Sequence, residues 1–314
     1  MLKLIGSRLV LVIPQLLIVG LLVFSLLYLV PGSAAALILG DAANPESIKE
    51  VEAQLGLDRP FLEQLGTWFA NAVQGDLGNS YLYKRPVADL VLERLPATLS
   101  LVGGGLLVAM VVGVGLGLLA GVNARRLVDR GVTGFSALMQ SMPEFWVGLL
   151  LVLVFVIQLG WFPVVAWTPP GADTGKWLRG LVLPALALGT GASALIARQT
   201  RTAVAEALSS RYADTLTAAG VPRGRIIFRY ALKNAMIPVL AASALAVGIL
   251  FGTSLVMERV FAFPGLGSLL LSSVISKDLP VVQGAALVVC LIVIAVNLIV
   301  DIAYGVLNPR ARPQ

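Results

Sequence analysis

The sequence lacks the side chains that most often carry metal and redox chemistry. The 314 residues contain no histidine, and the one cysteine, Cys290, lies inside a long apolar run. Histidine is the usual metal ligand and the usual general base near neutral pH, and a single thiol has no partner for an internal disulfide. We therefore expect no metal site and no redox chemistry in this chain.

One short stretch imitates a phosphate-binding loop. The segment "GADTGKW" (Gly171–Trp177) has two glycines, the second followed by a lysine. A phosphate loop needs four residues between these glycines and a Ser or Thr after the lysine, whereas this segment has three residues there and ends in Trp177. The chain is therefore expected to hold no nucleotide and no other cofactor of its own.

Polar groups inside the apolar runs are the remaining candidates. The ionisable ones are essentially Glu144 and Asp301, and each lies near an end of its run. Carriers coupled to protons or ions usually place acidic residues near the middle of the membrane, so this pattern disfavours such a carrier. A pore-lining role is one interpretation of the following set: Glu144, Gln158, Ser243, Thr253 and Ser254.

The composition places these groups in a membrane protein. Hydrophobic residues make up 58% of the chain, charged residues 13%, and the mean hydropathy is +0.90, which is far outside the range of soluble domains. A spanning helix needs about 20 mostly apolar residues. Six spans are predicted on this basis: 9–30, 97–122, 132–160, 180–198, 237–257 and 282–305. In the third span, Pro143 either kinks the helix or starts its regular part. The predicted fold class is an all-α membrane protein.

The charged residues predict how the spans are oriented. Basic residues gather before the first span, in the second and fourth gaps, and after the sixth span: Lys3 and Arg8; Arg125, Arg126 and Arg130; Arg198, Arg201, Arg211, Arg223, Arg225, Arg229 and Lys233; Arg310 and Arg312. Because cytoplasmic loops are rich in Lys and Arg, both termini are expected in the cytoplasm. The region 31–96 has nine acidic and five basic residues, which suits the outer face. The net charge of +6 is dispersed among apolar spans, which argues against nucleic-acid binding.

Three regions follow from this layout. Residues 1–30 form the N-terminus and the first span, whose apolar run exceeds the roughly 7 to 15 residues of a cleavable signal, so we expect an uncleaved anchor. Residues 31–96 form an extracytoplasmic region with two amphipathic helices, which lie on the membrane interface, cap the bundle, or help to dock an extracytoplasmic partner. Residues 97–314 form the core, with five spans and a cytoplasmic loop at about 199–236.

Small residues recur at four-residue spacing in two of the spans. They are Gly113, Gly117 and Gly121 in the second span, and Ala185, Gly189, Ser193 and Ala197 in the fourth. Such stripes let helix backbones approach closely inside a membrane. We therefore interpret them as packing surfaces rather than as a dinucleotide-binding loop.

The cytoplasmic loop contains the stretch "YADTLTAAGVPRGRIIFRYALKNAMIPVL" (Tyr212–Leu240). A helix running out of the fourth span is expected to end at Gly220, which tolerates a left-handed conformation, and a second helix to begin at Pro222. Basic residues surround the apolar side of this second helix: Arg223, Arg225, Arg229 and Lys233. Contact with anionic lipid accounts for these charges but leaves the tight turn unexplained.

The segment "YADTLTAAG" resembles the cytoplasmic EAA loop of ABC-importer permeases. Asp214 stands at the acidic position of that loop and Gly220 at its glycine, while Thr215 and Leu216 replace two alanines. Six further segments are similar to the B-type subunit of the dipeptide, oligopeptide and nickel branch: "LGLDRPF" (55–61), "GDLGNSY" (75–81), "RPVADLVLERLPATLSL" (85–101), "ALKNAMIPV" (231–239), "FAFPGLGSLL" (261–270) and "NLIVDIAYGVLNPRAR" (297–312). The similarity covers nearly the whole chain. A local departure is Ser33 of "PGSA", where this branch usually has Asp.

This resemblance implies the type I importer permease fold and a subunit that catalyses no reaction itself. It implies a heterodimer with a second permease, two ABC ATPases that bind ATP and Mg, an extracytoplasmic binding protein, and a bacterial cytoplasmic membrane. The surface expected to contact an ATPase consists of Asp214, Thr215, Ala218, Gly220, Pro222 and Arg223.

Several alternatives stay open at this point. The cargo implied by the branch is a dipeptide or oligopeptide, or else nickel or a haem-like ligand. From other classes of protein, an ion-coupled secondary carrier and a non-transporting membrane scaffold remain as rivals. Transport that survives depletion of ATP would favour the carrier, and failure to co-purify with any ATPase would favour the scaffold.

Overall fold

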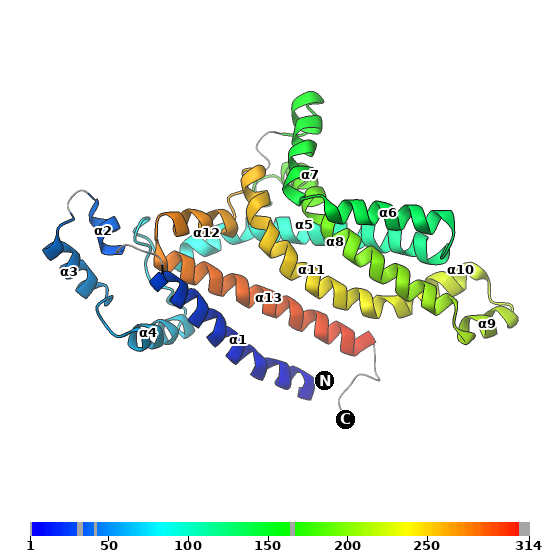
Figure 1. Ribbon diagram of the computed structural model, residues 1–314, viewed down its shortest axis with the longest axis horizontal. Helices are drawn as coiled ribbons and strands as arrows, with labels where there is room; N and C mark the ends of the chain where they lie inside the picture. The colour runs from blue at the N-terminus through cyan, green and yellow to red at the C-terminus, as the bar shows by residue number, and fades with distance from the viewer. Residues whose placement is uncertain (1, 30–33, 41–42, 164–166, 308–314) are drawn as a thin grey trace. The chain divides into compact units, whose positions relative to one another are not determined.

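The computed structural model describes residues 2–29, 34–40, 43–163 and 167–307 (Figure 1). Within these ranges the regular elements are helices, and the one extended pairing is an isolated bridge between Asn79 and Pro86. The helices are α1 (Leu2–Leu29), α2 (Ala34–Leu39), α3 (Pro45–Gln54), α4 (Phe61–Val73), α5 (Val87–Val122), α6 (Leu127–Ser141), α7 (Glu144–Leu151), the π-helix η2 (Val152–Gln158), α8 (Thr174–Leu208), α9 (Arg211–Ala218), α10 (Arg223–Arg225), the π-helix η3 (Ile226–Ala231), α11 (Leu232–Val260), α12 (Leu266–Ile275) and α13 (Leu279–Leu307). The predicted all-α class is confirmed for this part of the chain.

Among the described residues, four helices are long and apolar enough to cross a membrane. They are Val87–Val122, Thr174–Leu208, Arg223–Val260 and Leu279–Val300, and they contain the second, fourth and fifth predicted spans and most of the sixth. A fifth span results if the bent pair α6 and α7 counts as one crossing. The first predicted span falls on α1 up to Leu29, its last residue lies outside the described ranges, and a span count of six remains a prediction.

The third predicted span is not one straight helix. The segments Leu127–Ser141 and Glu144–Gln158 meet at 94°. Met142 is extended (φ −81°, ψ 128°), and Pro143 is the N-cap of α7, as expected because proline disfavours helical geometry in the residue before it. Pro143 therefore both breaks the helix and starts the next one, and the prediction of a continuous span at 132–160 is corrected in this respect.

The chain forms two compact units. One contains Ala97–Phe263, and the other contains Gly6–Pro96 together with Pro264–Ile294. The division of the chain at residue 96 into an outer region and a core is therefore a proposal about topology and not a description of these units.

Close backbone contact joins α5 and α8 in the first unit. A methyl group added at Gly113 would lie 2.8 Å from the Ser193 carbonyl oxygen, and one at Gly117 would lie 2.5 Å from that of Ala197. A methyl at Gly189 would in turn lie 2.8 Å from the Gly105 carbonyl oxygen. The small-residue stripes of the two helices thus face each other, which confirms their interpretation as packing surfaces.

The second unit contains the two predicted amphipathic helices, α3 and α4. Phe61 of α4 packs edge-on against Phe24 of α1, with ring centroids 5.3 Å apart, and the Phe69 ring lies over Gly20 of α1. The aromatic face of α4 is therefore covered, at least in part, by α1. These contacts favour the capping interpretation for α4, although neither α3 nor α4 has a fully buried residue.

The second unit also holds the loop 79–86 against the start of α13. The carboxylate of Asp278, 1% exposed, accepts hydrogen bonds from the Ser80 hydroxyl and from the backbone N–H groups of Tyr81 and Leu82, the last two at 3.0 and 3.1 Å. Burial, and secondarily the charge of Asp278, raise the pKa of Tyr81 to about 12. This phenol therefore stays protonated at physiological pH, and it adds no second negative charge next to Asp278.

Candidate functional site

The basic stretch after α8 is built from separate short helices. The expected continuous helix from the fourth span to Gly220 is wrong, because α8 ends at Leu208 and α9 begins at Arg211. The hydroxyls of Ser209 and Ser210 donate to the carbonyls of Glu206 and Ala207, at 3.1 and 2.7 Å. Such local bonds compete with helix propagation. The two serines therefore end α8, and a separate helix, α9, begins at Arg211.

The turn at Gly220 has the predicted left-handed conformation. Its φ is +77°. Gly220 N–H donates to the Thr217 carbonyl and Val221 N–H to the Leu216 carbonyl, each at 3.0 Å, which is the hydrogen-bond pattern of a Schellman C-cap. Pro222 then serves as the N-cap of α10, which begins at Arg223, one residue later than predicted.

All six residues of the predicted contact surface are exposed: Asp214, Thr215, Ala218, Gly220, Pro222 and Arg223. Asp214, Thr215 and Ala218 share one face of α9, since positions i and i+4 are neighbours on a helix. Ala213, on the opposite side, is 6% exposed. α9 therefore has one buried side and one exposed side. Pro222 and Arg223, which follow the Gly220 turn, are exposed as well.

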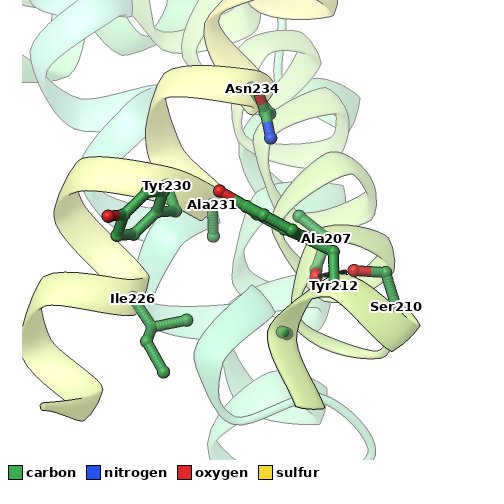
Figure 2. A pocket seen from close by; sticks show the side chains of 8 residues that line it. Ala207, Ser210, Tyr212, Ile226, Tyr230, Ala231 and Asn234 are labelled. Carbon is green, nitrogen blue, oxygen red and sulfur yellow. Dashed lines mark hydrogen bonds between the residues drawn. The ribbon is translucent and has the colours of Figure 1, made fainter. Parts of the chain in front are cut away.

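Aromatic packing fixes α9 on the helix that follows it. Figure 2 shows the Tyr212 side chain reaching from α9 towards Tyr230 and Ala231, and the two tyrosine rings meet edge-on with centroids 5.9 Å apart. A cavity of about 30 Å³ beside the two rings, lined also by Ala207 and Asn234, is large enough to hold a water molecule. An open groove of about 720 Å³ continues along Glu206 and Pro238. The loop is thus a packed element rather than a loose connection.

Two of the predicted path residues meet in the first unit. Thr253 of α11 lies beside the Glu144 carboxylate of α7, while its hydroxyl donates to the Ile249 carbonyl at 3.1 Å. Gly191 of α8 lies so close that an added methyl group would be 2.7 Å from Glu144 Oε1. The other oxygen, Oε2, is buried without a hydrogen-bond partner in the described part of the chain. Three helices therefore converge on one carboxylate that keeps an unused acceptor.

The other predicted path residues lie elsewhere. The Ser243 hydroxyl is buried and bonds the Val239 carbonyl at 2.8 Å, and that of Ser254 is buried and bonds the Phe251 carbonyl at 2.8 Å. Gln158 is exposed at the end of η2. In this conformation each serine hydroxyl bonds a carbonyl of its own helix. Of the predicted path residues, the structure therefore brings together only Glu144 and Thr253.

A buried acid in α11 escaped the sequence reasoning. Glu258 is 1% exposed, and its Oε1 accepts a hydrogen bond of 2.6 Å from the Thr98 hydroxyl of α5. It stands one residue beyond the predicted fifth span, 237–257, where an acid is normally taken as exposed. The side chain of Asp301, the second acid noted in the sequence, lies outside the described residues.

Comparison with known proteins assigns this chain to a family. The model of the family described as "binding-protein-dependent transport system inner membrane component" matches residues 113–313, and its N-terminal counterpart matches residues 1–102. A putative peptide transport system permease protein of Brucella abortus is 39% identical over 99% of both chains. The glutathione transport system permease protein GsiC of Escherichia coli K12 is 40% identical over the same shares.

A solved structure supports the fold. The MetNI methionine ABC transporter in an inward-facing conformation matches with a TM-score of 0.57 at 18% identity, over 70% of this chain and 96% of the other. At that identity the match speaks for the fold alone. The family models together cover nearly the whole sequence, which confirms the resemblance to ABC-importer permeases, and the chain therefore belongs to the binding-protein-dependent transport system inner membrane component family.

Proposed function

We propose that this chain is one membrane subunit of an ABC importer that moves di- and oligopeptides, or a related small solute, across the bacterial cytoplasmic membrane. The observation that carries the proposal is the surface of Asp214, Thr215 and Ala218, exposed on α9 and fixed from behind by Tyr212 and the Schellman turn. The peptide and glutathione permease names of full-length relatives support the choice of cargo class.

The expected partners follow from this role. A second, non-identical permease completes the membrane part, two ATPases bind ATP and Mg in the cytoplasm, and a binding protein delivers cargo outside. This subunit holds no cofactor and breaks no bond; it changes conformation when the ATPases close on nucleotide, as in other two-state assemblies biased by a ligand bound elsewhere. Its contact with an ATPase consists of α9, the Gly220 turn, Pro222 and Arg223.

We place the translocation path near Glu144 and Thr253. The unpartnered Glu144 Oε2 is the free acceptor of this group. Because it is buried here, a polar cargo would donate a hydrogen bond to it only in a conformation that opens this group. Gln158, Ser243 and Ser254 join the path only in a conformation that exposes the two serines.

Six spans with both termini in the cytoplasm complete the proposal, with α1 and the bent α6–α7 pair each counted as one span. This topology rests on the distribution of basic residues, and thiol labelling tests it. In a Cys290→Ala background, Asn79→Cys should react with an impermeant maleimide added outside the cell, whereas Arg223→Cys should react only after permeabilisation. Both native residues are exposed, so access to reagent depends on the side of the membrane. The reverse pattern of labelling would contradict the topology.

Cargo selectivity is expected to reside mainly in the binding protein. The spans offer few unsatisfied polar groups, whereas a specific ligand site needs several placed together. Replacing the binding protein by that of a related importer should change which labelled peptides enter proteoliposomes by tenfold or more. Gln158→Ala and Ser243→Ala should alter the relative rates far less. A single span substitution that switched the preferred cargo, with the binding protein unchanged, would show that selectivity lies in this chain.

A further inference from the structure

A partly buried ion pair joins α6 to α8 in the first unit. Arg201 of α8 donates from Nε to Asp129 Oδ1 at 2.8 Å and from Nη2 to Oδ2 at 2.7 Å. The side chain of Asp129 is 4% exposed and that of Arg201 is 35% exposed. Two parallel charge-assisted hydrogen bonds fix direction as well as distance. The Asp129–Arg201 pair therefore sets where the first turn of α6 lies on α8.

The same carboxylate also holds the turn between α5 and α6. Arg125 N–H donates to Asp129 Oδ2 at 2.8 Å, with Arg125 in a left-handed conformation at φ 65°. The Thr133 hydroxyl adds a longer bond of 3.4 Å to Oδ1. Each carboxylate oxygen thus accepts from more than one donor. An asparagine at this position would turn an NH₂ group towards one of these donors and would lose part of the network.

The pair lies between the ATPase-contact surface and the candidate path. Arg201 belongs to the continuous helix that ends at Leu208, directly before α9. Asp129 belongs to α6, which leads through the 94° bend into α7 and Glu144. Both α6 and α7 pack on α8, and Figure 1 shows α6 lying along α8. A shift of α9 therefore reaches α6 through a bidentate bond rather than through apolar contacts alone.

We propose that Asp129 and Arg201 are positioning residues that make the bent α6–α7 pair move together with α8 during the transport cycle. This inference rests on the proposed function, because it takes α9 as the element that the ATPases move. An ion pair that is partly withdrawn from water is weak evidence for stability by itself, since desolvation of the two charges offsets much of their attraction. Its directional geometry suits a mechanical link better.

Spin-label distances in the assembled importer test this link without knowledge of the cargo. Labels are attached through Gly134→Cys on α6 and Glu206→Cys on α8, both exposed positions, in a Cys290→Ala background. With the native pair, the distance distribution should stay narrow and equal in the nucleotide-free and ATP-vanadate-trapped states. With Asp129→Asn, the two states should separate. Uptake of labelled di- and tripeptides per ATP hydrolysed should fall about tenfold, while ATPase subunits remain bound.

Control variants distinguish a pair that couples the movement of α6 to α8 from a pair that only stabilises the fold. Asp173→Asn removes the charge of the exposed Asp173–Lys176 pair at the other end of α8 but keeps an N-cap side chain, and it should behave as wild type. Arg201→Gln should reproduce the effect of Asp129→Asn, and the double variant should add little to either. If Asp129→Asn yields too little complex, Arg201→Lys, which keeps the charge without the two-pronged geometry, replaces it.

Two results would overturn the inference. One is a distance that changes between states in the wild type, since α6 and α8 would then move apart despite the pair. The other is a variant whose distribution is unchanged, or broadened equally in both states, because a pair that only stabilises the fold would behave in this way. A failure of the proposed function is recognised by a separate experiment. If α9 and its turn do not contact an ATPase, Gly220→Val leaves ATPase recovery and uptake normal, whatever the spin-label distances show.

Discussion

Gly117→Val is expected to prevent this chain from folding into a stable membrane subunit. A methyl group at Gly117 would lie 2.5 Å from both the Ala197 carbonyl oxygen and Thr200 Cβ. The carbonyl belongs to the backbone of α8, so relief requires the two helices to separate. Overpacking usually costs about 1–3 kcal/mol, and separating two backbones forfeits further contacts along the interface. Close backbone approach is a main source of helix association in lipid, so the loss should be near the upper end or beyond.

Gly115 supplies the matched control. It lies two residues away on the same helix, and an added methyl group there meets nothing within 4 Å. Gly115→Val should therefore give wild-type yield and thermal stability of the purified chain in detergent, where Gly117→Val gives little or aggregated protein. Equal stability of the two variants would contradict the close approach of α5 and α8.

Features with a local period were predictable from the sequence. The stripe at Gly113, Gly117 and Gly121 of α5 repeats every four residues, and the structure packs it against α8. The apolar face of "PFLEQLGTWFANAV" gave α4 within one residue. The turn at Gly220 was predictable because few residues other than glycine tolerate a left-handed conformation there. In each case the physical cause lies within one helix or one turn.

Features that depend on distant partners were not predictable. Asp129 and Arg201 are 72 positions apart, Thr98 and Glu258 are 160 apart, and Ser80 and Asp278 are 198 apart. By residue type alone, the acidic members of these pairs fit exposed charges. Asp129 was therefore not singled out, and the gap that contains it was assigned to the cytoplasm from its arginines. Only tertiary packing shows that these carboxylates are buried and bonded. These three pairs are among the polar links that fix one helix or loop against another within each unit.

The breaks at Ser209–Ser210 and at Pro143 were missed or left open for a related reason. Serines occur inside many helices, and their hydroxyl bonds to Glu206 and Ala207 end α8 only because α9 then packs through Tyr212 on Tyr230. Proline bends or starts helices with equal ease. The 94° angle after α6 depends on what α7 contacts, including Met257 and Phe261 near Gly148.

Gly220→Val is expected to leave the membrane subunit folded but to uncouple ATP hydrolysis from transport. At φ +77°, a non-glycine residue costs about 1–2 kcal/mol, and a β-branched side chain is the least compatible with this conformation. That strain is small beside the packing of the spans, so insertion and yield should be normal. In the loop it disfavours the Schellman turn by roughly 5- to 30-fold. Recovery of ATPase subunits, or peptide uptake per ATP hydrolysed in proteoliposomes, should fall by a similar factor.

The reason for this effect is conformational rather than steric, and the controls are chosen accordingly. A methyl group at Gly220 meets nothing within 4 Å, and the same is true at Gly224, which has no positive φ. Gly224→Val adds the same side chain to the same exposed loop without backbone strain, so it should transport normally. Gly220→Ala should lie between the two, because it carries the strain without the branch. If Gly220→Val and Gly224→Val had equal, normal ATPase recovery and uptake, the turn would not position an ATPase contact. The basic stretch would then be a helix resting on anionic lipid, to which its exposed Arg225 and Arg229 are equally suited.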